Sequence, residues 1–457
     1  MDRVPSSFRD PSGFVFMHNS KIYRQINHSY KNNYEQLMES GLYEKLVNIG
    51  ALIPHKEVSL SGCENNYKII EPQQVPFISY SYEWCFGQLK DAALLVLQMQ
   101  KIALDFDMSL KDASSFNVQF LKGKPIFIDS LSFEKYEKEK PWIAYKQFCE
   151  FFLAPLALIA YTDYRSGKLL QTNINGIPLD LAAKLLPLKA RLNPYIFLHI
   201  FLHAKKQSEY SNNHSNFKKK PHFSKRALTE LISNLEDCIK DLQWHPKNSA
   251  WADYYKDGDC ESYESSSLEN KKELVLKYLI EAKTEFLWDL GANTGLFSKI
   301  AAKKGISVIS MDYDAAAIEK SYKEIKDCSE ENILPLVIDL INPSPSIGWK
   351  NNERDSIFNR NHPDTVLVLA LVHHLAIGNN LPFSEIASFF SEISNNLIIE
   401  LVPKDDKQAQ LILRGREDIF EWYNEDNFEK EFSKLFTIKE KETISDSKRI
   451  IYLMEKK

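Results

Sequence analysis

Apolar residues in the second half of the chain fall into short runs of strand length, and stretches with helical spacing separate several of these runs. The runs lie at 286–290, 306–311, 334–340, 365–371 and 397–402. Strands that alternate with helices predict βαβ units and a parallel sheet. Two further runs, 436–444 and 449–454, flank a short polar turn and predict an antiparallel hairpin. We therefore expect an α/β fold here, a doubly wound and mostly parallel Rossmann-like sheet with an antiparallel carboxy-terminal hairpin.

The first half has a different order of elements. Strand-like runs surround one helical stretch between residues 13 and 80, and helical spacing dominates from 89 to 204. This order predicts an α+β domain with a small mixed lobe followed by a larger helical lobe. Residues 205–226 are rich in Ser, Asn and Lys and predict an exposed linker. The expected division is a domain at 1–215, a linker and helix at 216–245, and a domain at 246–457.

Composition is that of an ordinary globular protein. The 457 residues are 44% hydrophobic, and a net charge of −5 with a pI near 6.2 argues against a protein that wraps nucleic acid. The most apolar runs, 151–162 and 194–204, are shorter than the roughly 20 residues that a membrane span needs. Six cysteines without a CxxC spacing indicate reduced thiols. We expect a cytoplasmic protein without a membrane span or a nucleic-acid partner.

The chemistry of the second half is concentrated in residues 285–314. Asp289 ends the first predicted strand, and Gly291 and Gly295 form the turn into the next helix. Asp312 ends the second strand, 21 residues after Gly291, where a carboxylate can accept hydrogen bonds from both hydroxyls of a ribose. The dinucleotide fingerprint G-x-G-x-x-G is incomplete, which argues against NAD and FAD. The order D-x-G-x-x-x-G suits a nucleoside cofactor without a pyrophosphate.

This pattern resembles motif I and its acidic successor in class I S-adenosylmethionine-dependent methyltransferases, over roughly 250–457. The resemblance implies S-adenosylmethionine (SAM) as cofactor, with Asp339 at the adenine amino group, Leu340 beside the ring, and Tyr255 in an aromatic segment over the cofactor. An equal alternative for that segment is packing against the first strand. The residues assigned to the cofactor in this way are Asp289, Gly291, Ala292, Asn293, Gly295, Asp312, Tyr313, Asp339, Leu340, Ala370 and Tyr255.

Candidate bases follow from the chemistry of methyl transfer, an in-line displacement from a sulfonium in which a weakly acidic nucleophile needs a base. The fourth predicted strand ends in ALVHHL, which places His373 and His374 at the carboxyl edge of the sheet. Glu400, near the end of the fifth strand, is a further candidate. Side chains alternate along a strand, so we expect only one histidine to face the cofactor, with His374 preferred. The alternative is that both histidines shape the following loop.

Three residues of the first half have a second informative spacing. Asp112, Asn117 and the strand-end Asp129 resemble the catalytic loop and metal-binding strand of protein-kinase-like enzymes, including the aminoglycoside phosphotransferases. The resemblance implies that Asp112 orients an acceptor hydroxyl while Asn117 and Asp129 hold Mg²⁺ on ATP. The His-Arg, Phe-Gly and glycine-rich motifs of that family are missing, so an active kinase and a degenerate binding domain both stay open. A third interpretation is that these residues only cap loops.

Three longer stretches, SSFRDPSGFVF, LVHHLAIGNNLPF and LIIELVPK, resemble a bacterial group of two-part proteins often labelled nodulation-related methyltransferases. The expected function is methyl transfer from SAM to an oxygen or nitrogen atom, with a kinase-like domain that recruits the acceptor or senses a nucleotide. The alternatives are a bifunctional kinase-methyltransferase and a non-catalytic nucleotide- or SAM-binding protein. The acceptor, whether a small molecule, a glycan or a protein, is not identified by the sequence.

Overall fold

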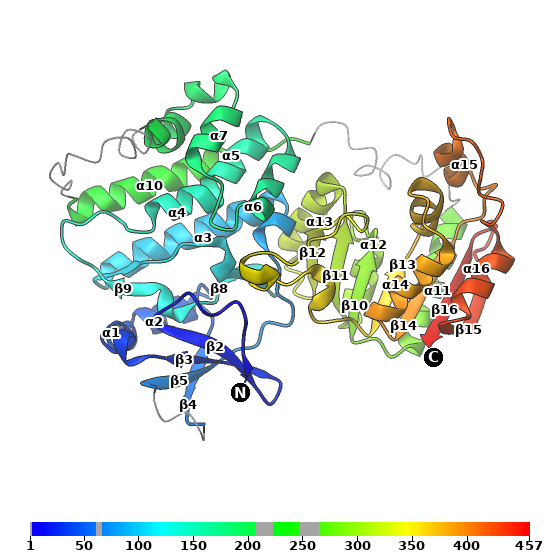
Figure 1. The fold of residues 1–457 in the computed structure, drawn as a ribbon, viewed down its shortest axis with the longest axis horizontal. Helices are drawn as coiled ribbons and strands as arrows, with labels where there is room; N and C mark the ends of the chain where they lie inside the picture. Colours follow the sequence, from blue (N-terminus) through cyan, green and yellow to red (C-terminus); the bar gives the residue numbers. More distant parts are fainter. Residues whose placement is uncertain (1, 61–65, 206–222, 247–264) are drawn as a thin grey trace. The chain divides into compact units, whose positions relative to one another are not determined.

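The computed structural model describes residues 2–60, 66–205, 223–246 and 265–457, and it contains two compact units (Figure 1). Unit 1 comprises Met1–His245 and Pro345–Ser356, and unit 2 comprises Pro246–Ser344 and Ile357–Lys457. The boundary at His245 assigns the helix expected in the linker region to unit 1. Within the described residues, no helix is both long and apolar enough to cross a membrane.

Unit 1 opens with a small antiparallel sheet and two helices. Its elements are β1 (Asp2–Arg3), β2 (Gly13–His18), β3 (Lys21–Ile26), η1 (His28–Tyr30), α1 (Lys31–Glu39), α2 (Leu42–Asn48), β4 (His55–Val58) and β5 (Lys68–Pro72). The five strands are ordered β1-β2-β3-β5-β4. The predicted hairpin of β2 and β3 turns at Asn19 and Ser20, which both have positive φ, as a tight two-residue turn requires. Tyr30 and Tyr34 are buried with Ile26 in one core cluster, which holds the helices to the sheet.

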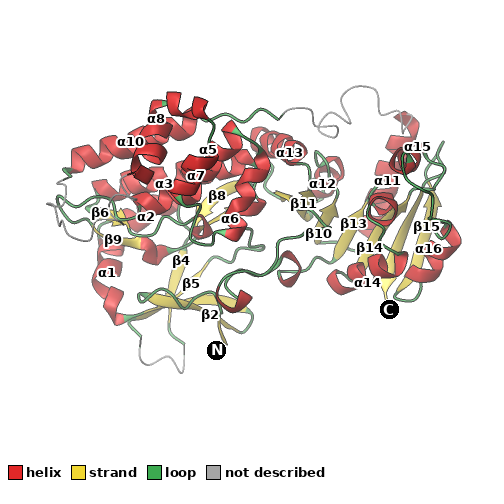
Figure 2. Cartoon of the chain, turned by 45° about the horizontal axis from the view of Figure 1, so that its top comes forward, coloured by secondary structure: helices red, strands yellow, loops and turns green. Residues whose placement is uncertain are grey.

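The rest of unit 1 is mostly helical (Figure 2). Its helices are η2 (Ser81–Glu83), α3 (Phe86–Asp105), η3 (Ser115–Asn117), η4 (Ser130–Ser132), α4 (Tyr145–Phe148), η5 (Cys149–Leu153), α5 (Ala154–Tyr161), η6 (Tyr164–Lys168), α6 (Leu169–Thr172), α7 (Leu179–Leu185), η7 (Leu188–Leu192), α8 (Pro194–Ile196), η8 (Phe197–Leu202) and α10 (Lys225–Asp241). Two antiparallel pairs join β6 (Met108–Leu110) to β9 (Phe133–Lys135) and β7 (Val118–Leu121) to β8 (Lys124–Phe127). Helix α10 buries Leu228, Ile232 and Leu235 at helical spacing and packs against α3.

A segment far along the chain, 345–356, also belongs to unit 1 and contains one more short helix, η9 (Trp349–Asn351). The carboxylate of Glu353 is almost fully buried and receives two hydrogen bonds from the Arg9 guanidinium, at 2.6 and 3.1 Å. The guanidinium of Arg354 lies 4.0 Å from the centre of the Phe116 ring. Contacts between residues so distant in sequence leave no local pattern, which is why the sequence analysis assigned this segment to the second domain.

Unit 2 is built on a seven-stranded mixed sheet. Its strands are β10 (Phe286–Leu290), β11 (Ser307–Asp312), β12 (Ile333–Val337), β13 (Thr365–Val368), β14 (Asn396–Leu401), β15 (Phe436–Thr443) and β16 (Ile450–Lys456). Its helices are α11 (Ser265–Glu281), α12 (Leu296–Ala302), α13 (Ala315–Cys328), η10 (Ile357–Asn359), η11 (His374–Gly378), α14 (Phe383–Ile393), α15 (Lys407–Leu413) and α16 (Glu425–Phe432). The order is β12-β11-β10-β13-β14-β16-β15, with β10 to β14 parallel and β16 antiparallel to both neighbours. The predicted mixed α/β sheet with a carboxy-terminal hairpin is confirmed.

The strand order also determines where a ligand can bind. The central strands β10 and β13 are buried almost throughout, as expected for parallel strands covered on both faces. Tyr278 of α11, Phe297 of α12 and Leu367 of β13 share one core cluster, which packs these two helices on the sheet. Because the chain proceeds from β10 to β11 on one side and later to β13 on the other, the carboxyl ends of these three strands meet at a topological switch point.

Candidate functional site

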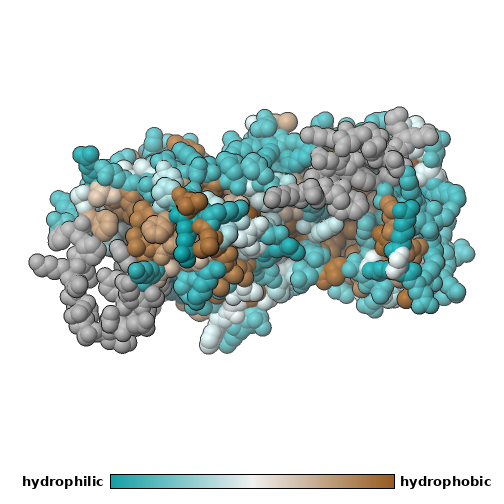
Figure 3. All heavy atoms as spheres, turned by 90° about the horizontal axis from the view of Figure 1, so that it is seen from above, coloured by the Kyte–Doolittle hydropathy of each residue, from teal (hydrophilic) through white to brown (hydrophobic). Residues whose placement is uncertain are grey.

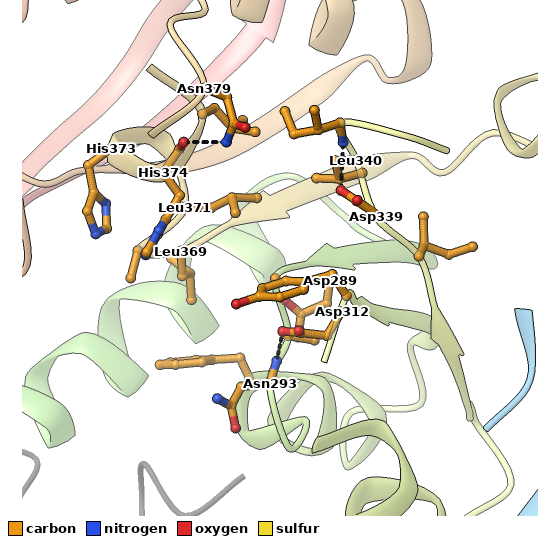
Figure 4. Close-up of a pocket in the computed structure, with 18 of the residues that line it drawn as sticks. Asp289, Asn293, Asp312, Asp339, Leu340, Leu369, Leu371, His373, His374 and Asn379 are labelled. Carbon is orange, nitrogen blue, oxygen red and sulfur yellow. Dashed lines mark hydrogen bonds between the residues drawn. The ribbon is translucent and has the colours of Figure 1, made fainter. Parts of the chain in front are cut away.

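A cavity of about 390 Å³ lies in unit 2 at this switch point (Figure 4). The residues that line it are Lys271, Asp289, Gly291, Ala292, Asn293, Phe297, Asp312, Tyr313, Ile338, Asp339, Leu340, Ile341, Leu369, Ala370, Leu371, His373, His374, Leu375, Asn379 and Gln408. Every predicted cofactor residue except Gly295 and Tyr255 is among them. Tyr255 lies outside the described residues. The structure therefore brings together side chains that are more than 80 positions apart in the sequence, such as Asp289 and His374.

The turn between β10 and α12 forms one wall of the cavity. Gly291, Asn293 and Gly295 all have left-handed backbone angles, with φ of 73°, 53° and 76°. Glycine adopts this conformation freely and asparagine tolerates it. A Cβ on Gly295 would come within 3.0 Å of the Ser321 hydroxyl, so a side chain has little room there. Gly295 thus shapes the turn from behind, while Gly291 and Asn293 border the cavity.

Two buried carboxyl groups lie side by side in the cavity (Figure 4). Asp289 accepts a hydrogen bond from the Ser298 hydroxyl at 2.6 Å, and Asp312 accepts from the backbone N–H groups of Asn293 and Asp314, both at 2.8 Å. Burial raises the pKa of each carboxyl group from 3.8 to about 6, although the hydrogen bonds oppose the shift. Both groups are therefore largely ionised at neutral pH. A ligand that brings a positive charge or hydroxyl donors would compensate them.

The opposite end of the cavity is formed by the chain that follows β12. Asp339 lies two residues beyond the end of that strand, and its carboxylate accepts a hydrogen bond from the backbone N–H of Ile341 at 3.0 Å. Leu340 and Ile341 add apolar surface beside it, and Tyr313 borders the cavity from the end of β11. One exposed carboxylate next to apolar side chains suits a flat heteroaromatic ring with an amino group.

The two histidines lie on a third side of the cavity, and the expected strand alternation between them is wrong. Strand β13 ends at Val368, Ala370 has a positive φ of 48°, and the backbone of His373 is already helical before the π-helix η11 begins. Consecutive side chains on a helix are not directed to opposite faces, so both imidazoles line the cavity, with ring centres 4.3 Å apart. Burial lowers the pKa of both, more strongly for His373, which is 1% exposed. Because burial disfavours the charged imidazolium, both rings are held in the neutral form, which has a free nitrogen lone pair but is a weaker base than a solvated imidazole.

Glu400 lies behind the cavity wall and is not one of the lining residues. Its fully buried carboxylate accepts hydrogen bonds from Lys271 at 2.6 Å, from the backbone N–H of Ala370 at 2.8 Å and from Arg449 at 3.4 Å. Arg449 in turn donates to both oxygens of Asp406, at 2.8 and 3.0 Å. A carboxylate held by two cations is a weak proton acceptor, so this geometry counts against the expected role of Glu400 as a base.

Several lining residues were missed by the sequence analysis. Lys271 lies on α11, where a lysine is usually solvated, and nothing in its sequence neighbourhood indicates that its ammonium is buried in an ion pair. Leu371 touches the glycine turn, since a Cβ on Gly291 would lie 3.4 Å from one of its methyl carbons. Asn379 and Gln408 come from a loop and from α15. Only the nearness of Leu371 and Asn379 to the predicted histidine pair could have suggested them.

In unit 1 the three kinase-like residues are neighbours. Burial raises the pKa of Asp112, the charge of Asp129 adds to the shift, and a hydrogen bond from Asn117 opposes it. Asp129, however, forms an ion pair with Arg24 at 2.9 Å, and Arg24 also pairs with Asp10 at 2.8 Å. In the part of the chain that the structure describes, no group of three or more His, Cys, Asp or Glu side chains could hold a metal ion. The ion pair with Arg24 engages the strand-end carboxylate that the kinase resemblance assigns to Mg²⁺.

No protein-family model matches the chain. The nodulation protein NoeA of Rhizobium meliloti (strain 1021) is 34% identical over 469 residues, which cover 99% of this chain and 96% of that protein. Among solved structures, the N-methyltransferase NodS from Bradyrhizobium japonicum WM9 matches 42% of this chain and 98% of its own, with 11% identity and a TM-score of 0.31. The bifunctional kinase-methyltransferase WbdD matches 44% of this chain and 42% of its own, with 15% identity and a TM-score of 0.31. These low scores leave the chemical interpretation to the geometry of the cavity.

Proposed function

The chain belongs to the family of the nodulation protein NoeA, and from the geometry of its cavity we propose that it is a SAM-dependent methyltransferase. One observation carries the proposal. The buried carboxyl groups of Asp289 and Asp312, on neighbouring parallel strands, border one cavity beside a glycine turn at the switch point of the sheet. SAM offers the matching groups, because it has an ammonium and two ribose hydroxyls and lacks a pyrophosphate.

The roles follow from where each side chain lies. Asp312 would accept hydrogen bonds from the ribose hydroxyls, and Asp289 would balance the ammonium of the methionine portion. Asp339 and Leu340 would receive the adenine at the other end of the cavity. Gly291 allows the backbone to approach the ligand closely, since no side chain projects from it into the space bordered by Leu371.

When bound, SAM supplies a methyl group on a sulfonium, and the protein has to align the acceptor, exclude water and remove a proton. We assign the proton transfer to His374, which lines the cavity and is only partly buried. His373 packs beside it in the wall, and its Nδ1 has no hydrogen-bond partner among the described residues. This buried atom is available to an acceptor group or to a water molecule. The methylated atom is oxygen or nitrogen in this proposal, and its carrier is a small molecule, a glycan or a protein.

A second candidate function, phosphoryl transfer by unit 1, is favoured by the proximity of Asp112, Asn117 and Asp129 and opposed by the Arg24 ion pair. We propose that unit 1 assists the methyltransferase by recruiting its acceptor and does not act as a kinase. A thermal-shift measurement with ATP and Mg²⁺ tests whether unit 1 has a nucleotide site, which phosphoryl transfer requires. A magnesium-dependent rise in the unfolding temperature would favour the bifunctional alternative.

The decisive test of the proposed function is calorimetric titration of the full chain with S-adenosylhomocysteine (SAH). We expect Asp312→Asn to weaken binding about 10- to 150-fold, because a charged acceptor of two hydroxyl donors is worth about 1.5 to 3 kcal/mol in a desolvated site. Asp327→Asn, an exposed carboxylate at the end of α13, is the matched control and should bind like the wild type. Failure of the wild type to bind SAH, or equal affinity in both variants, would eliminate the assignment.

A further inference from the structure

Unit 1 exposes a group of large apolar side chains that its own core does not use. We call Leu185, Leu188, Leu192, Phe197 and Leu198 the apolar face. They belong to α7, η7 and η8, which pack against one another. Leu188 and Leu192 are 77% and 85% exposed, the highest values among the large hydrophobic residues that the structure describes. Figure 3 shows hydrophobic side chains gathered on the surface over the helical part of unit 1.

All charged side chains in the same stretch of chain are Lys or Arg. No Asp or Glu occurs from residue 181 to residue 207, whereas Lys184, Lys189, Arg191 and Lys205 lie in this range and are exposed. Arg191 precedes Leu192 in the chain, and its guanidinium lies 4.9 Å from the centre of the ring of Phe201 in η8. A hydrophobic centre with a cationic rim is the composition that binds anionic interfaces.

The neighbouring carboxylates do not cancel this charge. Asp180 pairs with Lys184 at 3.5 Å, which neutralises one cation at the edge. Asp241 of α10 accepts a hydrogen bond from the Asn193 side chain at 3.1 Å. Lys189 and Arg191, which flank the exposed Leu188 and Leu192 in the chain, form no ion pair with either of these carboxylates. The charges of Lys189 and Arg191 are therefore not neutralised by Asp180 or Asp241.

We propose that the apolar face docks unit 1 on an anionic membrane surface. The exposed leucines would enter the boundary between headgroups and acyl chains, and Lys189 and Arg191 would contact the phosphate and carboxylate groups of the lipids. A second copy of this chain is a poorer occupant, because a self-complementary contact would bring the cationic rims of both copies together. The helical segments lie on the surface of the unit, so this docking needs no membrane span.

Co-sedimentation of the full chain with vesicles tests the proposal. The protein should pellet with vesicles of phosphatidylcholine and phosphatidylserine, should pellet much less with phosphatidylcholine alone, and should be released by high salt. The variant Leu188→Asp/Leu192→Asp should lose vesicle binding. The variant Lys189→Gln/Arg191→Gln should bind anionic vesicles about 30-fold more weakly, the effect of two surface cations.

The matched control is Ile280→Asp, which places the same charge on a 60% exposed aliphatic residue of α11 in unit 2. It should bind vesicles like the wild type. All substituted side chains are exposed, so the thermal midpoints of the variants should match that of the wild type. The proposal fails if the wild type does not bind anionic vesicles or binds both vesicle types equally. It also fails if Ile280→Asp loses as much binding as Leu188→Asp/Leu192→Asp. It also fails if sedimentation velocity shows a dimer that Leu188→Asp/Leu192→Asp dissociates.

Discussion

The carboxylates of Asp289 and Asp312 are buried in the folded protein, whereas water solvates them in the unfolded chain. Asp289 accepts from the hydroxyl and the backbone N–H of Ser298, and Asp312 accepts from three backbone N–H groups, which is less than an ionised carboxylate in water receives. The raised pKa values of the two carboxyl groups result from this deficit in solvation. The deficit is also what makes the pair a good site for an ammonium and for ribose hydroxyls.

The affinity for SAH should therefore depend on pH in a defined direction. Below a pH of about 6 the two carboxyl groups become protonated, so Asp289 loses its attraction for the ammonium and Asp312 becomes a weaker acceptor for the ribose hydroxyls. Affinity should therefore rise between about pH 5 and pH 7 and level off above. Calorimetric titrations across this range measure the effect. Asp289→Asn should bind weakly and with a shallower pH dependence. A wild-type affinity that stays constant over the range would contradict the assignment of the carboxyl pair.

The same shift predicts that Asp289→Asn stabilises the protein without ligand. A carboxyl group whose folded pKa of about 6 exceeds its unfolded value of 3.8 contributes stability below pH 4, and this stability is lost as the pH rises through 6. At pH 7.5 the neutral amide should raise the free energy of unfolding by about 1 to 3 kcal/mol, measured by chemical denaturation. Near pH 4, where the wild-type group is protonated, the two proteins should be equally stable. A variant that is less stable at pH 7.5 would show that the ionised carboxylate is fully compensated.

At the scale of elements, the cavity wall depends on a buried charge group that joins α11, β14 and the carboxy-terminal hairpin. Lys271, Glu400, Arg449 and Asp406 alternate in sign, and Glu400 also receives the N–H of Ala370. Ala370 has a left-handed backbone, which costs a non-glycine residue about 1 kcal/mol or more. The hydrogen bond to Glu400 helps to hold this turn and, through it, the start of the histidine-bearing helix.

Glu400→Ala should lower the free energy of unfolding by about 3 to 5 kcal/mol, because it leaves two buried cations without their shared carboxylate. Chemical denaturation measures the change. The variant Lys271→Met/Glu400→Leu/Arg449→Met keeps only Asp406, the least buried member of the group, and should recover a large part of the stability, since apolar groups of similar size often replace a buried ion group well. Glu440→Ala, a half-buried residue of β15 whose ion pair with Lys277 is long at 3.8 Å and lies at the surface, is the control and should change stability by less than about 0.5 kcal/mol. A small loss in Glu400→Ala would mean that water reaches this group.

At the scale of the whole molecule, the chain passes between the two units at 245/246, 344/345 and 356/357. The short segment between the last two passages contributes to unit 1 through Glu353 and Arg354, although its flanking residues belong to unit 2. Each unit is therefore completed by residues from distant parts of the chain, which makes a simple cut at residue 246 a poor way to separate them.

Arg354→Ala should lower the stability of unit 1 by about 1 to 3 kcal/mol, because it removes a largely buried guanidinium from the Phe116 ring. The affinity of unit 2 for SAH should not change. Chemical denaturation and calorimetry of the full chain measure the two quantities. Lys350→Ala, exposed in the same segment, should alter neither. A loss of SAH affinity in Arg354→Ala alone would mean that the segment also supports the cofactor cavity.

The sequence was sufficient to predict those elements of this protein that depend on interactions between residues close together in the chain. The strand, glycine turn, helix and second strand from 286 to 312 were predictable because apolar periodicity and turn chemistry act over a few residues. For the same reason the spacing of Asp289, Gly291 and Asp312 predicted three residues of the cavity. The antiparallel hairpin at the carboxy terminus was readable from two apolar runs and a short turn.

The remaining features of the site and of the two units were decided by the tertiary structure alone, because they depend on contacts between residues that are distant in the sequence. The helical backbone at His373 follows from the turn at Ala370, which is held by Glu400 thirty residues later. Glu400 is a candidate base by its place at a strand end, and only the fold gives it Lys271 and Arg449 as partners from two other elements. Arg24 and Asp129 form an ion pair although they are more than a hundred positions apart in the sequence, and segment 345–356 belongs to unit 1. Charge pairing and packing at such separations leave no periodicity in the sequence, so only the folded chain reveals them.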